Sequence, residues 1–168
     1  MKIYIGSDHG GFKLKEEVMK ELSTLGIEFE DVSPNFDEND DYPDACEALG
    51  RKVAENQTRG IMICASGTGS AIAANKVKGV RAASLQTEEL VYLARLHNDI
   101  NLLCLKGLEF EKPINEIAQS GNYKNLLNIP SKVADVKHAM KLIKLFLETD
   151  FEAGRHERRV KKIEAMEE

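Results

Sequence analysis

The sequence predicts an α/β protein: a three-layer α/β/α sandwich with a five-stranded, mostly parallel sheet and a C-terminal helix. Short apolar runs alternate along the chain with longer stretches whose apolar residues recur every three or four positions, the pattern of strands alternating with amphipathic helices. Strands joined through helices form right-handed crossovers, which produce a parallel sheet covered on both faces. The length of 168 residues suits one domain, which we expect to span 1–168.

The first strand is predicted at residues 2–7, where the apolar run Ile-Tyr-Ile leads into a Gly-Ser pair. A helix follows over 12–25, because its leucines and valine fall three or four apart, and Gly26 supplies its C-terminal stop. A second strand is predicted at 27–32. The acidic stretch 33–43 is typical of a solvated surface loop, and we expect no catalytic role for it.

The next unit is a helix from Pro43 to about Asn56 and a buried strand that ends at Cys64. A Ser/Gly/Thr loop then opens into the helix-favouring run 71–74. Glycines let this loop approach a ligand closely, and the N–H groups of the first helical turn suit an anion. A cysteine at such a junction is a candidate catalytic thiolate, although many buried cysteines in α/β proteins have no chemical role.

The rest of the chain continues the pattern, with an insertion near 109–131 for which we expect a short helix and loop. The final helix is rich in charge. Arg155 and Arg159 lie four residues apart, a spacing that puts both guanidinium groups on one helical face and suits one phosphate. A solvated helix with arginines paired to neighbouring glutamates is the alternative. The remaining predicted elements are strands at 80–84 and 101–105 and helices at 87–96, 133–147 and from 155 onward.

Composition excludes several classes of protein. The net charge of −5 argues against a nucleic-acid partner, and 42% hydrophobic with 30% charged residues indicates a globular chain. The three cysteines are read as reduced thiols of a cytoplasmic protein. No secretory leader or membrane-spanning run is recognised, so we expect no membrane partner.

Ligands of parallel sheets bind outside the carboxyl ends of the strands. That rule puts Asp8 and His9, after the first strand, beside the loop that follows Cys64. His97 and Asn98 precede the last strand of the sheet and therefore start on the opposite edge of their own chain. A second subunit could bring them back to the site.

The sequence also bears on three other functions: nucleotide binding, metal catalysis and non-catalytic ligand binding. A nucleotide-binding module is disfavoured because Ile72 stands where a third glycine is needed and no acidic residue ends the next strand. Metal catalysis is disfavoured because the four histidines lack ligand spacing, so no metal and no cofactor are expected. A non-catalytic binding protein on the same fold stays open, against which the retained polar and thiol residues argue.

Several motifs, in order along the chain, resemble the ribose-5-phosphate isomerase B and galactose-6-phosphate isomerase family, whose fold is Rossmann-like. The resemblance covers residues 1–105 and resumes near Lys137. The motifs are Gly6-Ser-Asp8-His9-Gly-Gly, Asp41-Tyr42-Pro43-Asp44, Cys64 with Ser66-Gly67-Thr68-Gly69, Ile72-Ala-Ala-Asn75-Lys76, Gly79-Val80-Arg81-Ala82-Ala83, His97-Asn98-Asp99 and Phe151-Glu152-Ala-Gly154-Arg155-His156.

The resemblance implies a cofactor-free aldose–ketose isomerisation of a sugar phosphate through an enediolate. It implies that Cys64 moves the proton between carbons and that His97 helps open the sugar ring. By the same matching, Asp8 and Asn98 hold sugar hydroxyls, the loop residues Ala65, Ser66, Gly67, Thr68 and Gly69 line the reacting end, and His9, Arg155 and Arg159 hold the phosphate. The family's sites lie between two subunits, so a homodimer, or a dimer of dimers, is expected.

Ribose 5-phosphate is the expected substrate, and a hexose 6-phosphate of the galactose or allose type is the alternative. Three departures from the family pattern bear on this choice. The family's Gly-Ala-Arg is replaced by Lys106-Gly107-Leu108, which removes a phosphate-binding arginine, and the cysteine is followed by Ala65 in place of glycine. The insertion begins directly after the missing arginine.

Overall fold

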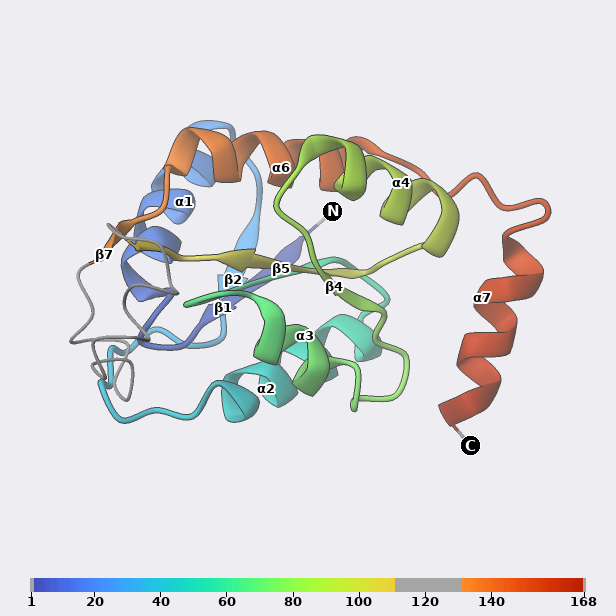
Figure 1. Ribbon diagram of the computed structural model, residues 1–168, viewed down its shortest axis with the longest axis horizontal. Coiled ribbons are helices and arrows are strands. Elements are labelled where there is room, and N and C mark those ends of the chain that lie inside the picture. The colour runs from blue at the N-terminus through green and yellow to red at the C-terminus, as the bar shows by residue number, and fades with distance from the viewer. Residues whose placement is uncertain (1, 111–130, 168) are drawn as a thin grey trace.

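The computed structural model describes residues 2–110 and 131–167 and shows three layers, with a parallel sheet between two layers of helices (Figure 1). The sheet has the strand order β2-β1-β3-β5-β4, and every neighbouring pair is parallel. The predicted fold class is therefore confirmed. The strands are β1 (Ile3–Ser7), β2 (Phe29–Asp31), β3 (Gly60–Cys64), β4 (Ala82–Ser84) and β5 (Leu102–Lys106).

Each face of the sheet is covered by its own set of helices. One core joins the odd-numbered side chains of β1, β3 and β5 to α1, α4 and α6, and the other joins the even-numbered ones to α2 and α3. In the part of the chain that the structure describes, no helix has the length and apolar character needed to cross a bilayer. The helices are α1 (Phe12–Thr24), α2 (Tyr42–Glu55), α3 (Thr68–Ala74), α4 (Glu88–Asn98), α6 (Val136–Glu148) and α7 (Glu157–Glu164), and the 3-10 turn η2 (Ala165–Glu167) follows α7.

Parallel pairing gives the sheet two chemically different edges. The register pairs Ser7 with Ile63 and Cys64 with Lys106, so β1, β3 and β5 end side by side. Helices run back antiparallel to the strands, so α4 ends at the opposite edge, where β5 begins. A strand of five residues is about 16 Å long, which separates the two edges by roughly that distance.

The region around residue 110 differs from the prediction. β6 (Leu108–Phe110) pairs antiparallel with β7 (Ser131–Val133), with Leu108 opposite Val133 and Phe110 opposite Ser131. The prediction of a helix and loop over 109–131 is therefore wrong at both of its ends, because residues 109–110 and 131 belong to two paired strands. Residues 111–130 lie outside the described part of the chain.

The C-terminal helix α7 extends away from the three layers, at the end of the molecule opposite β7 (Figure 1). Its attachment to the body includes ionic and backbone contacts: Arg81 lies 3.1 Å from Glu164, and the Gly79 N–H donates to Glu167 at 2.9 Å. Both contacts are made at the loop that precedes β4. The helix is thereby held at the edge of the sheet where the strands begin.

Candidate active site

Cys64 ends β3 and is 4% exposed, and its sulfur lies on the α3 side of the sheet, where it meets Ser70. The Gly67 N–H donates to Cys64 Sγ at 3.0 Å. The Ser70 hydroxyl lies 3.3 Å from the same sulfur and 2.9 Å from Gly67 O, and its single proton can serve only one of them. The sulfur therefore accepts from one backbone N–H and lies beside one hydroxyl, and the thiolate is the reactive form of a thiol.

The backbone of the cysteine loop depends on a glycine at position 67. Gly67 has a φ of +81°, a left-handed conformation that L side chains rarely adopt. A Cβ built there would lie 2.6 Å from Ser84 Oγ. Because Gly67 also gives the N–H that contacts the sulfur, its conformation fixes the surroundings of the thiol. The structure thus brings Cys64 and the predicted loop residues 65–69 together.

The other two cysteines have a different environment. Burial raises the pKa of the Cys46 thiol to about 12. Burial also raises the pKa of the Cys104 thiol, against a smaller opposing effect of its hydrogen bond with Ser70. Both side chains belong to the apolar core under α2 and α3. These thiols stay protonated at neutral pH, which leaves Cys64 as the candidate base.

Two further predicted site residues, Asp8 and His9, directly follow the carboxyl end of β1 and lie at the same edge of the sheet. Asp8 is 5% exposed, its Oδ1 accepts from the Gly11 N–H at 3.0 Å, and burial raises the pKa of its carboxyl. His9 lies beside it, and Asp40 Oδ1 accepts from His9 Nδ1 at 2.6 Å and from the His9 N–H at 3.0 Å. The acidic loop, for which the sequence predicted no role, therefore contacts a candidate phosphate ligand.

Tyr42 is a second residue whose role the sequence did not reveal. A Cβ on Gly69 would lie 2.8 Å from Tyr42 Cζ, so the phenol ring rests against the cysteine loop. The side chain stays partly exposed. Its Asp-Tyr-Pro-Asp motif carried the family resemblance, and that motif was the only signal for Tyr42 in the sequence.

The segment after β5 forms backbone hydrogen bonds with the end of β3 and the residue that follows it. The Gly107 N–H donates to Cys64 O at 2.7 Å, and the Leu108 N–H approaches Ala65 O at 3.4 Å. A side chain at residue 107 would clash with Gly10 O at 2.7 Å. Lys106 pairs with Cys64 in the β3–β5 register, so a cationic residue stands one strand away from the cysteine.

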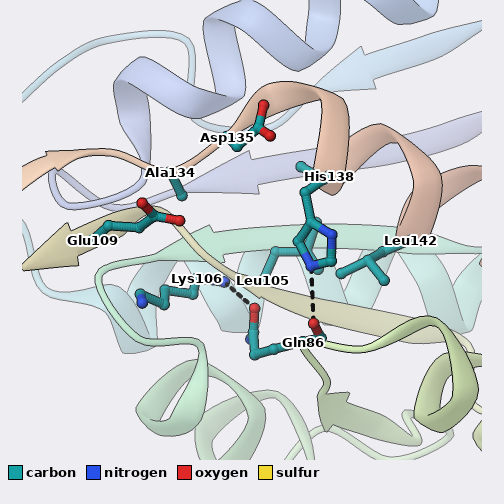
Figure 2. Close-up of a pocket in the computed structure, with 9 residues that line it drawn as sticks. Gln86, Leu105, Lys106, Glu109, Ala134, Asp135, His138 and Leu142 are labelled. Carbon is teal, nitrogen blue, oxygen red and sulfur yellow. Dashed lines mark hydrogen bonds between the residues drawn. The ribbon is translucent and has the colours of Figure 1, made fainter.

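A pocket of about 220 Å³ opens near the same edge on the other side of the sheet (Figure 2). Gln86 lies at its lower side: its Oε1 accepts from the Lys106 N–H at 3.3 Å, and its backbone carbonyl accepts from His138 Nε2 at 2.9 Å. Leu105 and Leu142 in its wall belong to the core under α6. The pocket is therefore separated by the sheet from the sulfur of Cys64.

The opposite edge carries the second group of predicted residues. His97 and Asn98 form the last turn of α4. The ring of His97 stacks on that of His156, with centroids 4.1 Å apart and an interplanar angle of 4°. Glu152 Oε2 lies 3.6 Å from the Nε2 atom of each ring. Burial, assisted by His97 and the neighbouring arginines, lowers the pKa of His156.

The two arginines are arranged differently from the prediction. α7 begins only at Glu157, with His156 as its N-cap, so Arg155 precedes the helix and does not share a face with Arg159. Instead both side chains converge on one imidazole: Arg155 Nε is 3.2 Å from His156 Nε2, and Arg159 Nη1 is 3.4 Å from His156 Nδ1. The prediction that both guanidinium groups project from one helical face is therefore wrong, and their binding of one phosphate stays a prediction.

His97, Glu152 and His156 are also the one group of metal-ligand type found among residues 2–110 and 131–167. Two features oppose a metal ion there. The imidazole planes are parallel and stacked, so their nitrogen lone pairs cannot both point at one ion. Two guanidinium groups lie against His156 and would repel a cation. The cluster suits an anion better.

The chain matches the family model described as Ribose/Galactose Isomerase over residues 3–163. It belongs to the ribose/galactose isomerase family. Two relatives are similar over nearly their whole length. The probable ribose-5-phosphate isomerase B of Mycoplasma genitalium is 38% identical, with 96% of this chain and 92% of the relative aligned. The ribose-5-phosphate isomerase B of Escherichia coli is 32% identical, with 99% and 96% aligned.

The fold of this family member is also found in solved structures. The crystal structure of ribose-5-phosphate isomerase B from Mycoplasma genitalium with bound ribulose-5-phosphate superposes with a TM-score of 0.79 at 37% identity, and covers 99% of this chain and 95% of that one. The enzyme from Clostridium thermocellum gives a TM-score of 0.80 at 35% identity, with 99% and 97% covered. Sequence and structure therefore agree on the family.

Proposed function

We propose that this protein is a sugar-phosphate aldose–ketose isomerase that interconverts ribose 5-phosphate and ribulose 5-phosphate. The observation that carries the proposal is its likeness, over 99% of the chain, to an isomerase crystallised with bound ribulose-5-phosphate. The geometry at the end of β3 supports it, because a thiol that accepts from the Gly67 N–H at the start of a glycine-containing loop suits proton transfer next to a carbonyl.

In the proposed reaction, the Cys64 thiolate removes the proton from C2 of the open-chain aldose. The electron pair of that C–H bond forms the C1–C2 double bond, and the carbonyl oxygen becomes the enediolate oxygen. The proton of the C2 hydroxyl moves to the C1 oxygen, and the thiol returns its proton to C1. C2 then carries the carbonyl of the ketose, and no atom is gained or lost. First-turn N–H groups of α3 lack acceptors within the helix and can stabilise the enediolate charge.

The remaining predicted residues divide between the other steps. His97 is the proposed acid–base group for ring opening, and Asp8 and Asn98 are the proposed ligands of the sugar hydroxyls. Arg155, Arg159 and His9 are the proposed ligands of the phosphate, since cationic donors bind its oxygens strongly.

We propose further that two copies of the chain share each site. Cys64 ends β3, whereas His97 lies at the edge where the strands begin, about one strand length away. An apolar groove lined by Leu90, Leu93, Ala94 and Ile163 runs along the outer strand β4, and it also includes Asn98. A second copy packed there in antiparallel orientation, related by a two-fold axis, would bring its own Cys64 to the first copy's His97.

The test is a spectrophotometric isomerase assay with ribose 5-phosphate, in parallel with galactose 6-phosphate and allose 6-phosphate. We expect turnover of ribose 5-phosphate by the wild type and by Cys46→Ala, and loss of turnover in Cys64→Ala. Faster turnover of a hexose 6-phosphate would reassign the substrate. No turnover of any of the three, by a protein whose fold is verified by circular dichroism, would refute the function.

A further inference from the structure

The acidic loop after β2 is exposed to solvent, but specific contacts hold it against α1. Lys15 has no exposed surface; its ammonium lies 2.8 Å from Asp31 and also donates to the Ser33 carbonyl. The ring of Phe36 packs edge-on against Phe12 at a centroid distance of 5.4 Å. The loop is therefore attached to α1 both at its start and in its middle.

A turn at the end of the loop directs the carboxylate of Asp40 toward His9. Asp37 O accepts from the Asp40 N–H at 3.3 Å, and Asp37 Oδ1 accepts from the Asn39 N–H at 2.9 Å, so residues 37–40 form a turn. Every residue from Pro34 to Asp44 is exposed except Asp40. Its side chain turns inward, and one oxygen contacts both the ring and the backbone of His9.

These contacts determine the protonation of one ring nitrogen. A carboxylate only accepts hydrogen bonds, so the 2.6 Å contact requires a proton on His9 Nδ1. The opposite nitrogen, Nε2, is left for other partners, and about a quarter of the side chain is exposed. A phosphate dianion also only accepts, so a hydrogen bond to it from Nε2 requires a proton on that nitrogen as well, which is the imidazolium form of the ring.

We infer that Asp40 is a positioning residue for the substrate phosphate: it orients His9 and keeps a proton on Nδ1, so that Nε2 is the nitrogen that faces the phosphate dianion. This inference rests on the proposed function, since the phosphate is that of the proposed substrate. His9 would then supply a cation at the cysteine edge, the edge of the sheet where β1, β3 and β5 end. By the family resemblance, this chain has Leu108 there in place of an arginine. Asp40 acts through His9 and does not touch the substrate.

The alternative is that the Asp40–His9 contact only tethers the loop. A tether would affect thermal stability and would leave anion binding unchanged. The two roles are separated by direct binding of inorganic phosphate, measured by calorimetry on the full-length protein. Suitable variants are Asp40→Ala, Asp40→Asn and His9→Ala, with Glu38→Gln as the matched control, which removes one charge from the same loop at an exposed position.

We expect Asp40→Ala to weaken phosphate binding by about tenfold, as for loss of a hydrogen bond to a charged group, and Asp40→Asn to weaken it less, because its amide oxygen still accepts. Glu38→Gln should bind phosphate like the wild type. The double variant His9→Ala/Asp40→Ala should bind no more weakly than His9→Ala, because Asp40 acts through His9. In the isomerase assay KM should rise with the phosphate Kd while kcat changes little.

Nitrogen-15 NMR of the imidazole gives a readout that does not depend on activity. We expect a protonated His9 Nδ1 in the wild type and its loss or exchange between tautomers in Asp40→Ala. Equal phosphate affinities for Asp40→Ala and Glu38→Gln, or an unprotonated Nδ1 in the wild type, would overturn the inference. Phosphate binding that follows the expected cycle in a protein with no isomerase activity would refute the proposed function alone.

Discussion

The two edges of the parallel sheet hold different kinds of chemistry. At the edge where β1, β3 and β5 end, the buried thiol of Cys64 closes β3 and the buried carboxyl of Asp8 follows β1, and each accepts a backbone N–H from its own loop. At the edge where the strands begin, stacked imidazoles and guanidinium groups lie around His156. The comparison teaches that one copy of the chain separates the proposed proton-transfer group from most of the proposed phosphate ligands.

The largest expected effect is at the cysteine edge. Cys64→Ala removes the proposed base and should reduce kcat by roughly 10³-fold or more. Cys46→Ala is the matched control and should retain most of the activity, because the buried Cys46 thiol is protonated at neutral pH. The measurement is kcat with ribose 5-phosphate, with circular dichroism to check the fold. Comparable turnover by wild type and Cys64→Ala would remove the thiol from the mechanism.

The separation of the edges is tested by mixing two inactive variants. Cys64→Ala and His97→Ala homodimers each lack one half of every site, whereas a mixed dimer has one complete site and one doubly defective site. Random exchange makes half of the dimers mixed, so about a quarter of the wild-type activity should return. Native mass spectrometry measures the exchange. If mixed dimers form and the solution stays inactive, each copy builds its site alone.

A smaller effect is expected at the histidine edge, the edge of the sheet where the strands begin and where His97 stacks on His156. Arg155→Ala should raise KM by about tenfold, because it removes a charge-assisted contact with the phosphate, and should lower kcat less. Arg158→Ala, which changes an exposed arginine three residues further along the chain in α7, should leave KM unchanged. Lys106→Ala tests the other edge. A large KM effect for Lys106→Ala with a small one for Arg155→Ala would move the main phosphate ligand to the cysteine edge.

The smallest expected effect is on stability. Burial raises the pKa of Asp8, so ionising this carboxyl in the folded protein is unfavourable at neutral pH. Asp8→Asn removes that cost and keeps an acceptor for the Gly11 N–H, so it should raise Tm at pH 7 by about 2–4 °C. Below the raised pKa the wild-type carboxyl is neutral, and the gain should disappear as pH falls toward 4. An equal gain at both pH values would contradict this explanation.

Most of the fold could be predicted from the sequence because strand and helix periods differ clearly. The apolar run before Cys64 and the spaced leucines of α1 specify their elements locally. The ladder of β6 and β7 could not be predicted, since its pairing joins residues more than 20 positions apart and neither strand has a strong pattern. The start of α7 was also misplaced, because Arg155 has good helix propensity but lies before the N-cap.

The site was predicted where motifs are local. Cys64, its loop, Asp8 and His9 follow strands directly, so the topology alone assembles them. Asp40 and Tyr42 were missed for a physical reason: they reach the edge from a loop and a helix start, and a surface acidic residue has no sequence pattern that marks an inward turn. The stacking of His97 on His156 is likewise a tertiary contact between residues 59 positions apart.

The ladder of β6 and β7 has a consequence for how this protein can vary. It brings residue 110 next to residue 131, and the Gly107 carbonyl accepts from the Ala134 N–H at 2.9 Å just below it. The ladder therefore fixes the distance between residues 110 and 131, and joining two fixed ends by a longer segment costs little, about 0.6 kcal/mol for each doubling of its length. We expect segments of other lengths or sequences to be accepted between these two residues while the ladder and the end of β3 keep their geometry.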